Sequence, residues 1–200
     1  QLAMSYVSMN DHESSYAKLK EALTYARRAN DPDALAWTLT DLGVEHALHG
    51  CHLESDECFA EAHMICEKTE NSHMHSIVYW QHAETELRVG KFEKSVKTHR
   101  RCVELAIRAE FKDGLKWMLV SFGCALQSAG RTELASRVLA KVSKWRESEK
   151  RPMTGDELEI FGPAVKKLED ELGTEQFVRL WRKGEVCDLD ELVDELLKLT

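Results

Sequence analysis

Proline and glycine are scarce in this chain, with 3 prolines and 10 glycines among 200 residues. Because these residues interrupt regular structure most strongly, their scarcity favours long helices. No run approaches the roughly 18 to 20 apolar residues that a membrane-spanning helix needs, so we expect no integral membrane protein. The chain also opens without the basic and apolar segments of a secretory signal. It starts at Gln1 rather than at a methionine, and we expect a fragment of a longer protein.

An excess of basic residues is absent as well. The formal net charge is −8, whereas a surface that binds nucleic-acid phosphates is basic, so we expect no direct nucleic-acid partner. The six cysteines include no CxxC pair and follow no disulfide-framework spacing. We expect free thiols in a reducing cytoplasm, packed as small apolar side chains. With 43% hydrophobic and 31% charged residues, the composition is typical of a soluble globular protein.

A 40-residue repeat is the clearest positive feature of the sequence. Gly50, Gly90 and Gly130 lie 40 residues apart. Small residues recur in register before and after these glycines, at Gly43, Ala83, Gly123, Ser55, Ser95 and Ala135. Bulkier residues recur further along, at Phe59, His99 and Leu139, where the histidine departs from the pattern and predicts looser packing of the middle repeat. Such a fixed period predicts an array of helical repeats.

Each repeat predicts two antiparallel helices. Asp31 followed by Pro32 is a helix start, with aspartate as the N-cap and proline at the first helical position. A first helix then runs to the turn at Gly50, and a second helix runs from about 53 to 69. We therefore predict an all-α solenoid of antiparallel helix pairs over residues 1–152. Its units are a partial repeat at 1–30 and full repeats at 31–70, 71–110 and 111–151.

The 40-residue register ends after Pro152, and residues 153–200 predict a separate helical capping segment. Thr154 to Glu157 fits a capping box, and Pro163 predicts a kink or break in the helix that follows. The segment holds 13 acidic and 6 basic residues, which is most of the charge excess. A solenoid needs a terminal cap with a polar outer face, and we expect this segment to cover the third helix pair. An acidic docking tail is the alternative.

The order of small and large residues in each unit resembles the tetratricopeptide (TPR) motif, lengthened from about 34 residues to 40. HEAT repeats share the period but not this order. The stretch from Leu168 to Phe177, followed by Trp181 and Gly184, is similar to the closing segment of large bacterial regulators with TPR regions. These regulators are signal-transduction ATPases, transcription activators of the LuxR type and some nucleotide cyclases. The resemblance implies a sensor or docking arm for signal transduction and transcription regulation. The chain itself has neither a GxxxxGK[ST] loop nor a recognisable DNA-binding motif.

In TPR superhelices the first helix of each pair lines a concave surface, so the resemblance implies a binding groove there. The residues that the register places in it are Trp37, Thr40, Val44, Ile77, Trp80, Glu84, Arg88, Trp117, Val120 and Cys124. Tryptophans in such a groove would be rigid anchors. Alternatively, Trp37 and Trp117 pack between neighbouring repeats, whereas Trp80 has no aromatic counterpart in register. The implied ligand is an apolar or amphipathic peptide of a partner protein or of another domain of the same chain.

Several histidines and cysteines lie close together in the sequence and suggest a metal site. The richest group is His46, His49, Cys51, His52 and Cys58. It supports an alternative function as a metal- or redox-responsive sensor. The register assigns His46 to an inward-facing position and the residues after His49 to a turn, so we expect no bound cofactor. His73 and His75 are too close in sequence to share a helix face and are set aside.

Catalytic motifs are weaker still. His99 and Cys102 lie three residues apart, which is the spacing that a nucleophile and its base need on one helix. Cys102 occupies a small inward position of the repeat, however, and a buried structural thiol is inert. We therefore predict that the chain is not an enzyme but a non-catalytic module for protein–protein or peptide interaction.

Overall fold

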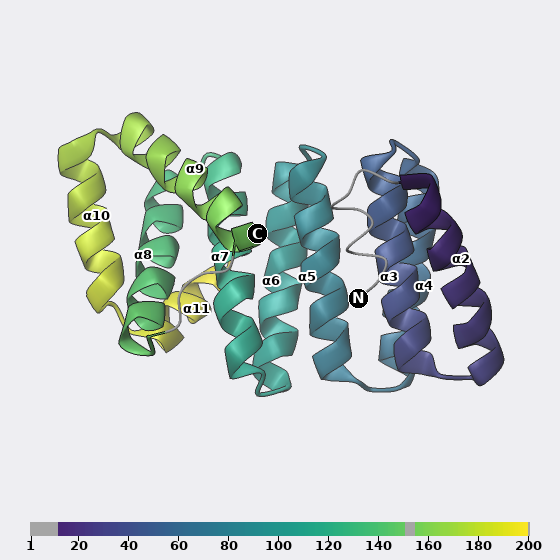
Figure 1. Cartoon of the computed structure of the whole chain (residues 1–200). Helices are drawn as coiled ribbons and strands as arrows, with labels where there is room; N and C mark the ends of the chain where they lie inside the picture. The colour runs from purple at the N-terminus through teal and green to yellow at the C-terminus, as the bar shows by residue number, and fades with distance from the viewer. Residues whose placement is uncertain (1–11, 151–154, 200) are drawn as a thin grey trace.

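The computed structural model describes residues 12–150 and 155–199, which form ten α-helices. After α2 (His12–Ala29) come three helix pairs: α3 (Pro32–Leu48) with α4 (His52–Lys68), α5 (Ser72–Arg88) with α6 (Phe92–Arg108), and α7 (Lys112–Ser128) with α8 (Thr132–Ser148). The pairs stand side by side in a row (Figure 1). Their first helices begin at residues 32, 72 and 112, which keeps the period of the sequence. The predicted all-helical architecture of consecutive packed helices is thus confirmed.

Two expected helix starts involve residues outside the described ranges. The helix expected at residues 1–9 lies wholly outside them, and so does Thr154, the first residue of the expected capping box. A third, at Asp31, is present: its carboxylate accepts hydrogen bonds from the backbone N–H groups of Asp33 and Ala34, and Pro32 follows as the first helical residue. The side chain therefore satisfies donors that have no partner inside the helix.

Two kinds of turn alternate along the row, and each contains a residue in the left-handed backbone region. Within the pairs it is a glycine, at Gly50, Gly90 and Gly130. Glycine adopts this conformation without the steric cost of a Cβ atom, which explains the 40-residue glycine spacing. Between the pairs the left-handed residues are Asn30, Glu70, Glu110 and Lys150.

The small residues of the register bring the two helices of each pair into close contact. A Cβ atom added at Gly43 would lie 3.0 Å from the ring of Phe59. At the equivalent Gly123 it would lie 2.5 Å from a methyl carbon of Leu139. The serine that follows each turn adds a hydrogen bond in the first two pairs, for example from Ser55 Oγ to the carbonyl oxygen of Gly43 at 2.7 Å.

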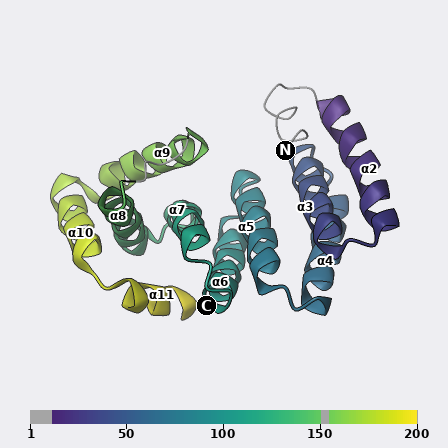
Figure 2. The same ribbon diagram turned by 60° about the horizontal axis from the view of Figure 1, so that its bottom comes forward.

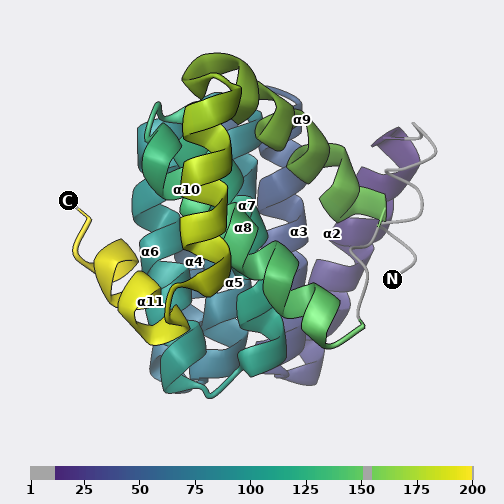
Figure 3. The same ribbon diagram turned by 90° about the vertical axis from the view of Figure 1, so that its left-hand side faces the viewer.

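Three helices follow the last pair and cover it. They are α9 (Gly155–Leu172), α10 (Thr174–Val186) and α11 (Leu189–Leu197). Helix α9 packs on α7, α10 on α8 and α11 on α6. Consequently α9 and α11 lie on opposite sides of the row (Figures 2 and 3). The break expected at Pro163 does not occur, because α9 continues through it.

The C-terminal helices combine apolar burial with charge pairing. Leu168, Leu192 and Leu196 are fully buried, so the apolar stripes of α9 and α11 face the repeats. Beside the apolar stripe of α11, the guanidinium of Arg137 donates two hydrogen bonds to the carboxylate of Glu195. The acidic residue of this helix therefore contacts a basic residue of α8.

The buried apolar side chains of the described residues form two clusters. The smaller one joins α3, α4 and the start of α5, and consists of Ala36, Leu39, Ala62, Cys66, Met74 and Val78. The larger one extends from α5 to α11 and contains the fully buried Phe122, Leu119 and Leu139. Helix α5 therefore contributes to both clusters, and they meet across it: Met74 and Val78 belong to the smaller cluster and Ile77 to the larger one.

Candidate groove on the concave face

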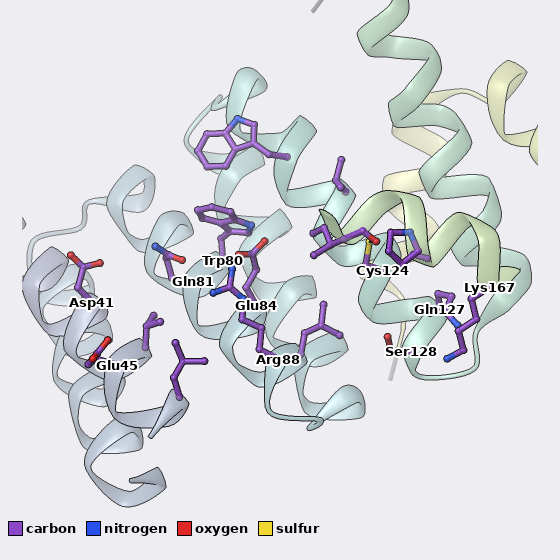
Figure 4. A pocket seen from close by; sticks show the side chains of 18 of the residues that line it. Asp41, Glu45, Trp80, Gln81, Glu84, Arg88, Cys124, Gln127, Ser128 and Lys167 are labelled. Carbon is purple, nitrogen blue, oxygen red and sulfur yellow. Dashed lines mark hydrogen bonds and ion pairs between the residues drawn. The ribbon is translucent and has the colours of Figure 1, made fainter. Parts of the chain in front are cut away.

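A groove opens on the face of the row that carries α3, α5, α7 and α9. Its volume is about 770 Å³, which lies within the range of roughly 300 to 1,000 Å³ that is usual for ligand sites. Figure 4 shows acidic side chains of α3 on one wall and Lys167 of α9 on the other. Its apolar lining includes Leu19, Val44, Leu48, Trp80, Leu87, Trp117, Val120, Ile160, Pro163 and Ala164.

Helix α5 forms the middle of the groove. Trp80, Glu84, Leu87 and Arg88 all line it, and their spacing of four, three and one residues places them on one helix face. Glu84 and Arg88 lie one turn apart, with 3.7 Å between their charged atoms. The middle of the groove therefore presents a large ring beside a paired carboxylate and guanidinium.

Trp80 is also part of a hydrogen-bonded chain that leads into the core. Its indole N–H donates to Ser121 Oγ at 3.0 Å, and Ser121 Oγ lies 3.0 Å from Nε2 of His99. Nδ1 of His99 lies 2.9 Å from the carbonyl oxygen of Ser95. This carbonyl can only accept, so Nδ1 carries the ring proton and Nε2 accepts from the serine.

These hydrogen bonds correct two expectations from the sequence, one about Trp80 and one about His99. Trp80 has a structural partner in the next repeat, and its ring also packs edge-on against Trp117 with 4.9 Å between centroids. A change at Trp80 would therefore alter packing as well as the groove. His99 does not loosen the middle repeat: it is fully buried and stacks on Phe122. Burial lowers the pKa of His99 to about 4, so the ring is neutral near pH 7.

Charged groups divide between the two ends of the groove. On α3, Asp41 and Glu45 line the wall, and burial raises the pKa of Asp41 to about 6. At the other end, Arg146 of α8 and Lys167 of α9 line it. The groove is thus acidic at its α3 wall and basic where α8 and α9 meet.

Helix α9 closes one end of the groove. It lies against α7, where the thiol of Cys124 donates to the carbonyl oxygen of Ile160 at 3.6 Å. Pro163 and Ala164 are the next turn of the same wall. Burial raises the pKa of Cys124 to about 12, so its thiol is protonated and acts as an apolar lining group.

Seven of the ten residues that the sequence places in the groove line it in the structure. They are Val44, Trp80, Glu84, Arg88, Trp117, Val120 and Cys124. They converge because the first helices of the pairs lie next to one another and present equivalent faces. The alternative for Trp117 also holds, since its ring contacts Trp80 and Phe111. It both lines the groove and packs between repeats.

The other three expected groove residues lie elsewhere, which corrects the sequence prediction. Thr40 is buried in α3, where its hydroxyl donates to the carbonyl oxygen of Ala36 at 2.8 Å. Ile77 belongs to the larger apolar cluster. Trp37 has 41% of its surface exposed but does not line the groove. The faces of successive first helices are rotated relative to one another, so equivalent positions do not all point into the groove.

Sequence reasoning missed the groove residues of α9 and α2, and also the charged residues Asp41, Glu45 and Arg146. Ile160, Pro163 and Lys167 line it although the sequence assigned their segment to a solvated cap. No repeat register connects this segment to α7. An indirect signal was available: the stripe from Leu158 to Leu168 needs an apolar surface to cover, and α7 offers one.

The residues suggested as a metal cluster do not converge. The ring of His46 packs edge-on against Tyr16, and Nε2 of His49 lies 3.2 Å from a carboxylate oxygen of Glu45. Cys51 is exposed in the turn. Among the described residues, no group of three or more histidine, cysteine, aspartate or glutamate side chains is arranged to hold a metal ion.

His99 and Cys102 have separate partners. His99 contacts Ser95 and Ser121, as described above, while the thiol of Cys102 donates to the carbonyl oxygen of Ser76 at 3.3 Å. Burial raises the pKa of Cys102 well above its usual value. The thiol is therefore protonated, and the geometry does not pair it with the imidazole.

Within residues 12–150 and 155–199, none of the helices is both long and apolar enough to span a bilayer. Comparison with known proteins adds no relative: no protein-family model matches the sequence, and no curated protein matches it either. The fold and the groove are therefore the observations from which a function is inferred.

Proposed function

We propose that this chain is a binding module that holds an amphipathic peptide of a partner protein in the concave groove. The observation that carries the proposal is the groove itself: an apolar lining with two tryptophans, and charged groups confined to its ends and to one pair in the middle. Large rings that are held in place by neighbours bind a partner with little loss of side-chain entropy.

The division of charge indicates how the peptide would lie. A basic residue of the peptide would approach Asp41 and Glu45, and an acidic residue or a free carboxylate would approach Lys167. Between them, apolar side chains would contact Val44, Trp80 and Val120. Like charges at either end would be disfavoured, so the charge pattern sets direction more than it adds affinity.

We further propose that the three pairs are lengthened TPR-like units and that the chain is the sensor or docking arm of a larger bacterial regulator. The support is the resemblance in the small-residue order and in the stretch from Leu168 to Gly184, together with helix pairs of equal length. On this proposal the peptide comes from a signalling partner or from another domain of the regulator.

Selection from a library of random twelve-residue peptides tests the groove. We expect the selected sequences to be amphipathic, with basic residues towards one end and acidic residues towards the other. Leu48→Lys places an ammonium group on the acidic α3 wall, at a side chain that is 41% exposed, where it repels the basic residue of the peptide. We expect it to weaken the affinity measured by fluorescence anisotropy tenfold or more, which equals about 1.4 kcal/mol.

Leu53→Lys is the matched control. Leu53 is 78% exposed on α4 and does not line the groove, so the same change there should leave the affinity unaltered. The proposal is wrong if the selected peptides share no charge order, or if the two variants weaken binding equally.

A further inference from the structure

Three histidines form a hydrogen-bonded layer between α4 and α5. Nε2 of His75 lies 3.2 Å from Nδ1 of His63, and Nε2 of His63 lies 3.2 Å from Nδ1 of His82. His63 belongs to α4, and the other two belong to α5. Tyr79 completes the layer, with its ring 4.0 Å from that of His63. We call these four residues the histidine layer.

A carboxylate at the end of the layer fixes the positions of its protons. Oε1 of Glu86 lies 3.4 Å from Nε2 of His82 and 3.0 Å from the ammonium of Lys94. The negative charge of this carboxylate favours a proton on Nε2 of His82, which leaves its Nδ1 to accept from His63. The same reasoning applies in turn to His63 and His75. We therefore assign the ring proton to Nε2 in all three histidines.

His63 and His82 have no place for an additional proton. Within the layer, each Nδ1 of His63 and His82 already accepts from the neighbouring ring, so protonating either one would set two N–H groups face to face. Burial, together with the neighbouring histidines, lowers the pKa of His63 to about 3. Burial and the charges of Lys94 and Lys91 lower the pKa of His82 to about 3. The layer is therefore neutral as long as α4 and α5 remain in contact.

The charged groups around the layer come mostly from α6, and the basic ones among them further lower the pKa values of the histidines. Burial lowers the pKa of His75; Glu67 of α4 opposes this, while Arg101 and Arg108 of α6 reinforce it. Lys94 is further paired with Asp56 of α4, at 3.8 Å. Burial raises the pKa of Glu86, and the nearby lysine opposes that rise. The titratable groups of α3 face elsewhere: Glu45 contacts His49, and Asp41 lines the groove.

The layer forms part of the junction between α4 and α5, where Ala62 and Cys66 also pack against Met74 and Val78 in the smaller apolar cluster, and it lies behind the groove. His75, Tyr79, His82 and Glu86 follow a spacing of four, three and four residues along α5, which defines one face. The groove-lining residues Trp80, Glu84 and Arg88 lie on another face of the same helix. One wall of the groove belongs to α3, before the junction, and the other walls belong to α5, α7 and α9, after it.

From this placement we infer that the histidine layer is an acid-sensitive hinge: the contact between α4 and α5 opens by taking up protons, and its opening moves the two walls of the groove apart. The consequence for ligand binding rests on the proposed function of the groove. The hinge itself does not.

The size of the effect follows from proton linkage. A histidine released into water titrates near its ordinary pKa of 6.5, whereas in the closed layer it stays neutral. Between pH 7.5 and pH 5.5 the open state is therefore favoured by about a further tenfold for each histidine released. Release of His63 and His82 together gives an increase of about a hundredfold, and release of His75, whose pKa is also lowered in the closed layer, adds to it.

Hydrogen exchange of the peptide-free chain at these two pH values tests the hinge. After correction for the intrinsic rates, we expect the opening constant of α4 amides to rise at least tenfold at pH 5.5, and to rise more than that of α7 and α8 amides. In His63→Gln the rise should be about tenfold smaller. His52→Gln, which changes an exposed histidine at the start of α4, should behave as the unmodified chain.

Equal increases in α4 and α8 would indicate global unfolding and would overturn the hinge, as would an unchanged increase in His63→Gln. If His63→Gln does not fold, His75→Gln replaces it with the same expectation. Nitrogen NMR of the unmodified chain provides an independent measurement: we expect the Nε2–H form for all three rings at pH 7.5, and an Nδ1–H form for His63 would also overturn the inference. Because no peptide is present, failure of the hinge is distinguishable from failure of the groove.

Discussion

Helices α2 to α4 and helices α5 to α11 contain the same repeat unit, yet they are covered to different extents. Among the described residues, the apolar cluster of α3 and α4 is small and reaches only the first turns of α5. The cluster that begins at α5 is covered by α9 on one side and by α11 on the other. The comparison shows that in a repeat protein the neighbours of a unit determine how well it is buried, as nearest-neighbour coupling predicts.

The contact between these two regions is also chemically distinct. Inside the larger region, α6 and α7 meet through apolar side chains such as Val103 and Leu119, and the buried imidazole of His99 there is hydrogen-bonded to serines rather than to other histidines. Between the regions, α4 and α5 meet through the rings of the histidine layer and through an apolar contact that joins Ala62 and Cys66 to Met74 and Val78. An apolar contact is insensitive to pH, whereas a layer of neutral imidazoles weakens when protons become available. The groove spans both regions, so this junction affects its width.

Removal of the covering helices should have the largest effect. A chain ending at Lys150 loses α9, α10 and α11 and exposes the apolar surface of α7 and α8 that contacts Leu168 and Leu196. We expect this chain to aggregate, or to unfold with a smaller denaturant m-value. Size-exclusion chromatography with light scattering and urea unfolding measure these effects. A monomer with unchanged stability would show that the covering helices contribute nothing to the larger region.

Acid should have the next largest effect. The folded-state pKa values of His63 and His82 are about 3 and that of His99 is about 4, against 6.5 when unfolded. In that window the unfolded chain binds more protons, so stability falls as the pH falls below about 6. Each histidine costs up to roughly 1.4 kcal/mol per pH unit, while Asp41, with its pKa raised to about 6, and Glu86, with its raised pKa, oppose the loss. Urea unfolding at pH 7, 6 and 5 measures the slope, and a flat profile would contradict it.

The helix pairs and most of the groove could be predicted from the sequence. The period of the small residues follows from local contacts such as those of Gly43 with Phe59 and Gly123 with Leu139, which each unit makes within itself. Groove residues such as Val44 and Glu84 follow from helical periodicity once the concave face is assumed. The assumption fails at Thr40 and Ile77 because the helices rotate along the row.

Two features could not be predicted because they depend on long-range packing. The wall formed by Pro163 and Lys167 requires knowing where α9 lies, and no repeat register relates α9 to α7. The histidine layer joins His63 to His75 across a turn, so no spacing within one helix relates these two residues. The spacing of His75 to Tyr79, His82 and Glu86 was a usable signal, since four, three and four residues mark one helix face.

The smallest expected effect compares one position in the two regions. An alanine at Gly43 must shift the ring of Phe59 by a few tenths of an ångström, because the added Cβ would lie at 3.0 Å. At Gly123 the distance is 2.5 Å to Leu139, which is fully buried. Alanine gains about 1 kcal/mol of helix propensity at either site, and overpacking costs about 1 to 3 kcal/mol.

We therefore expect Gly43→Ala to be close to neutral and Gly123→Ala to be destabilising by about 1 to 2 kcal/mol. Thermal and urea unfolding of the two variants provide the comparison. Equal effects would mean that the close packing of the larger region does not exceed that of the smaller one.

A hydrogen-exchange footprint of a selected peptide tests the central claim most directly, because the groove contains residues of both regions. We expect bound peptide to slow exchange in α3 around Asp41 to Leu48 and in α5 around Trp80 to Arg88 together, with no change on the outer surface of α6. Protection confined to one of the two regions, or located on α4, α6 or α8 instead, would contradict the assignment of the groove as the binding site.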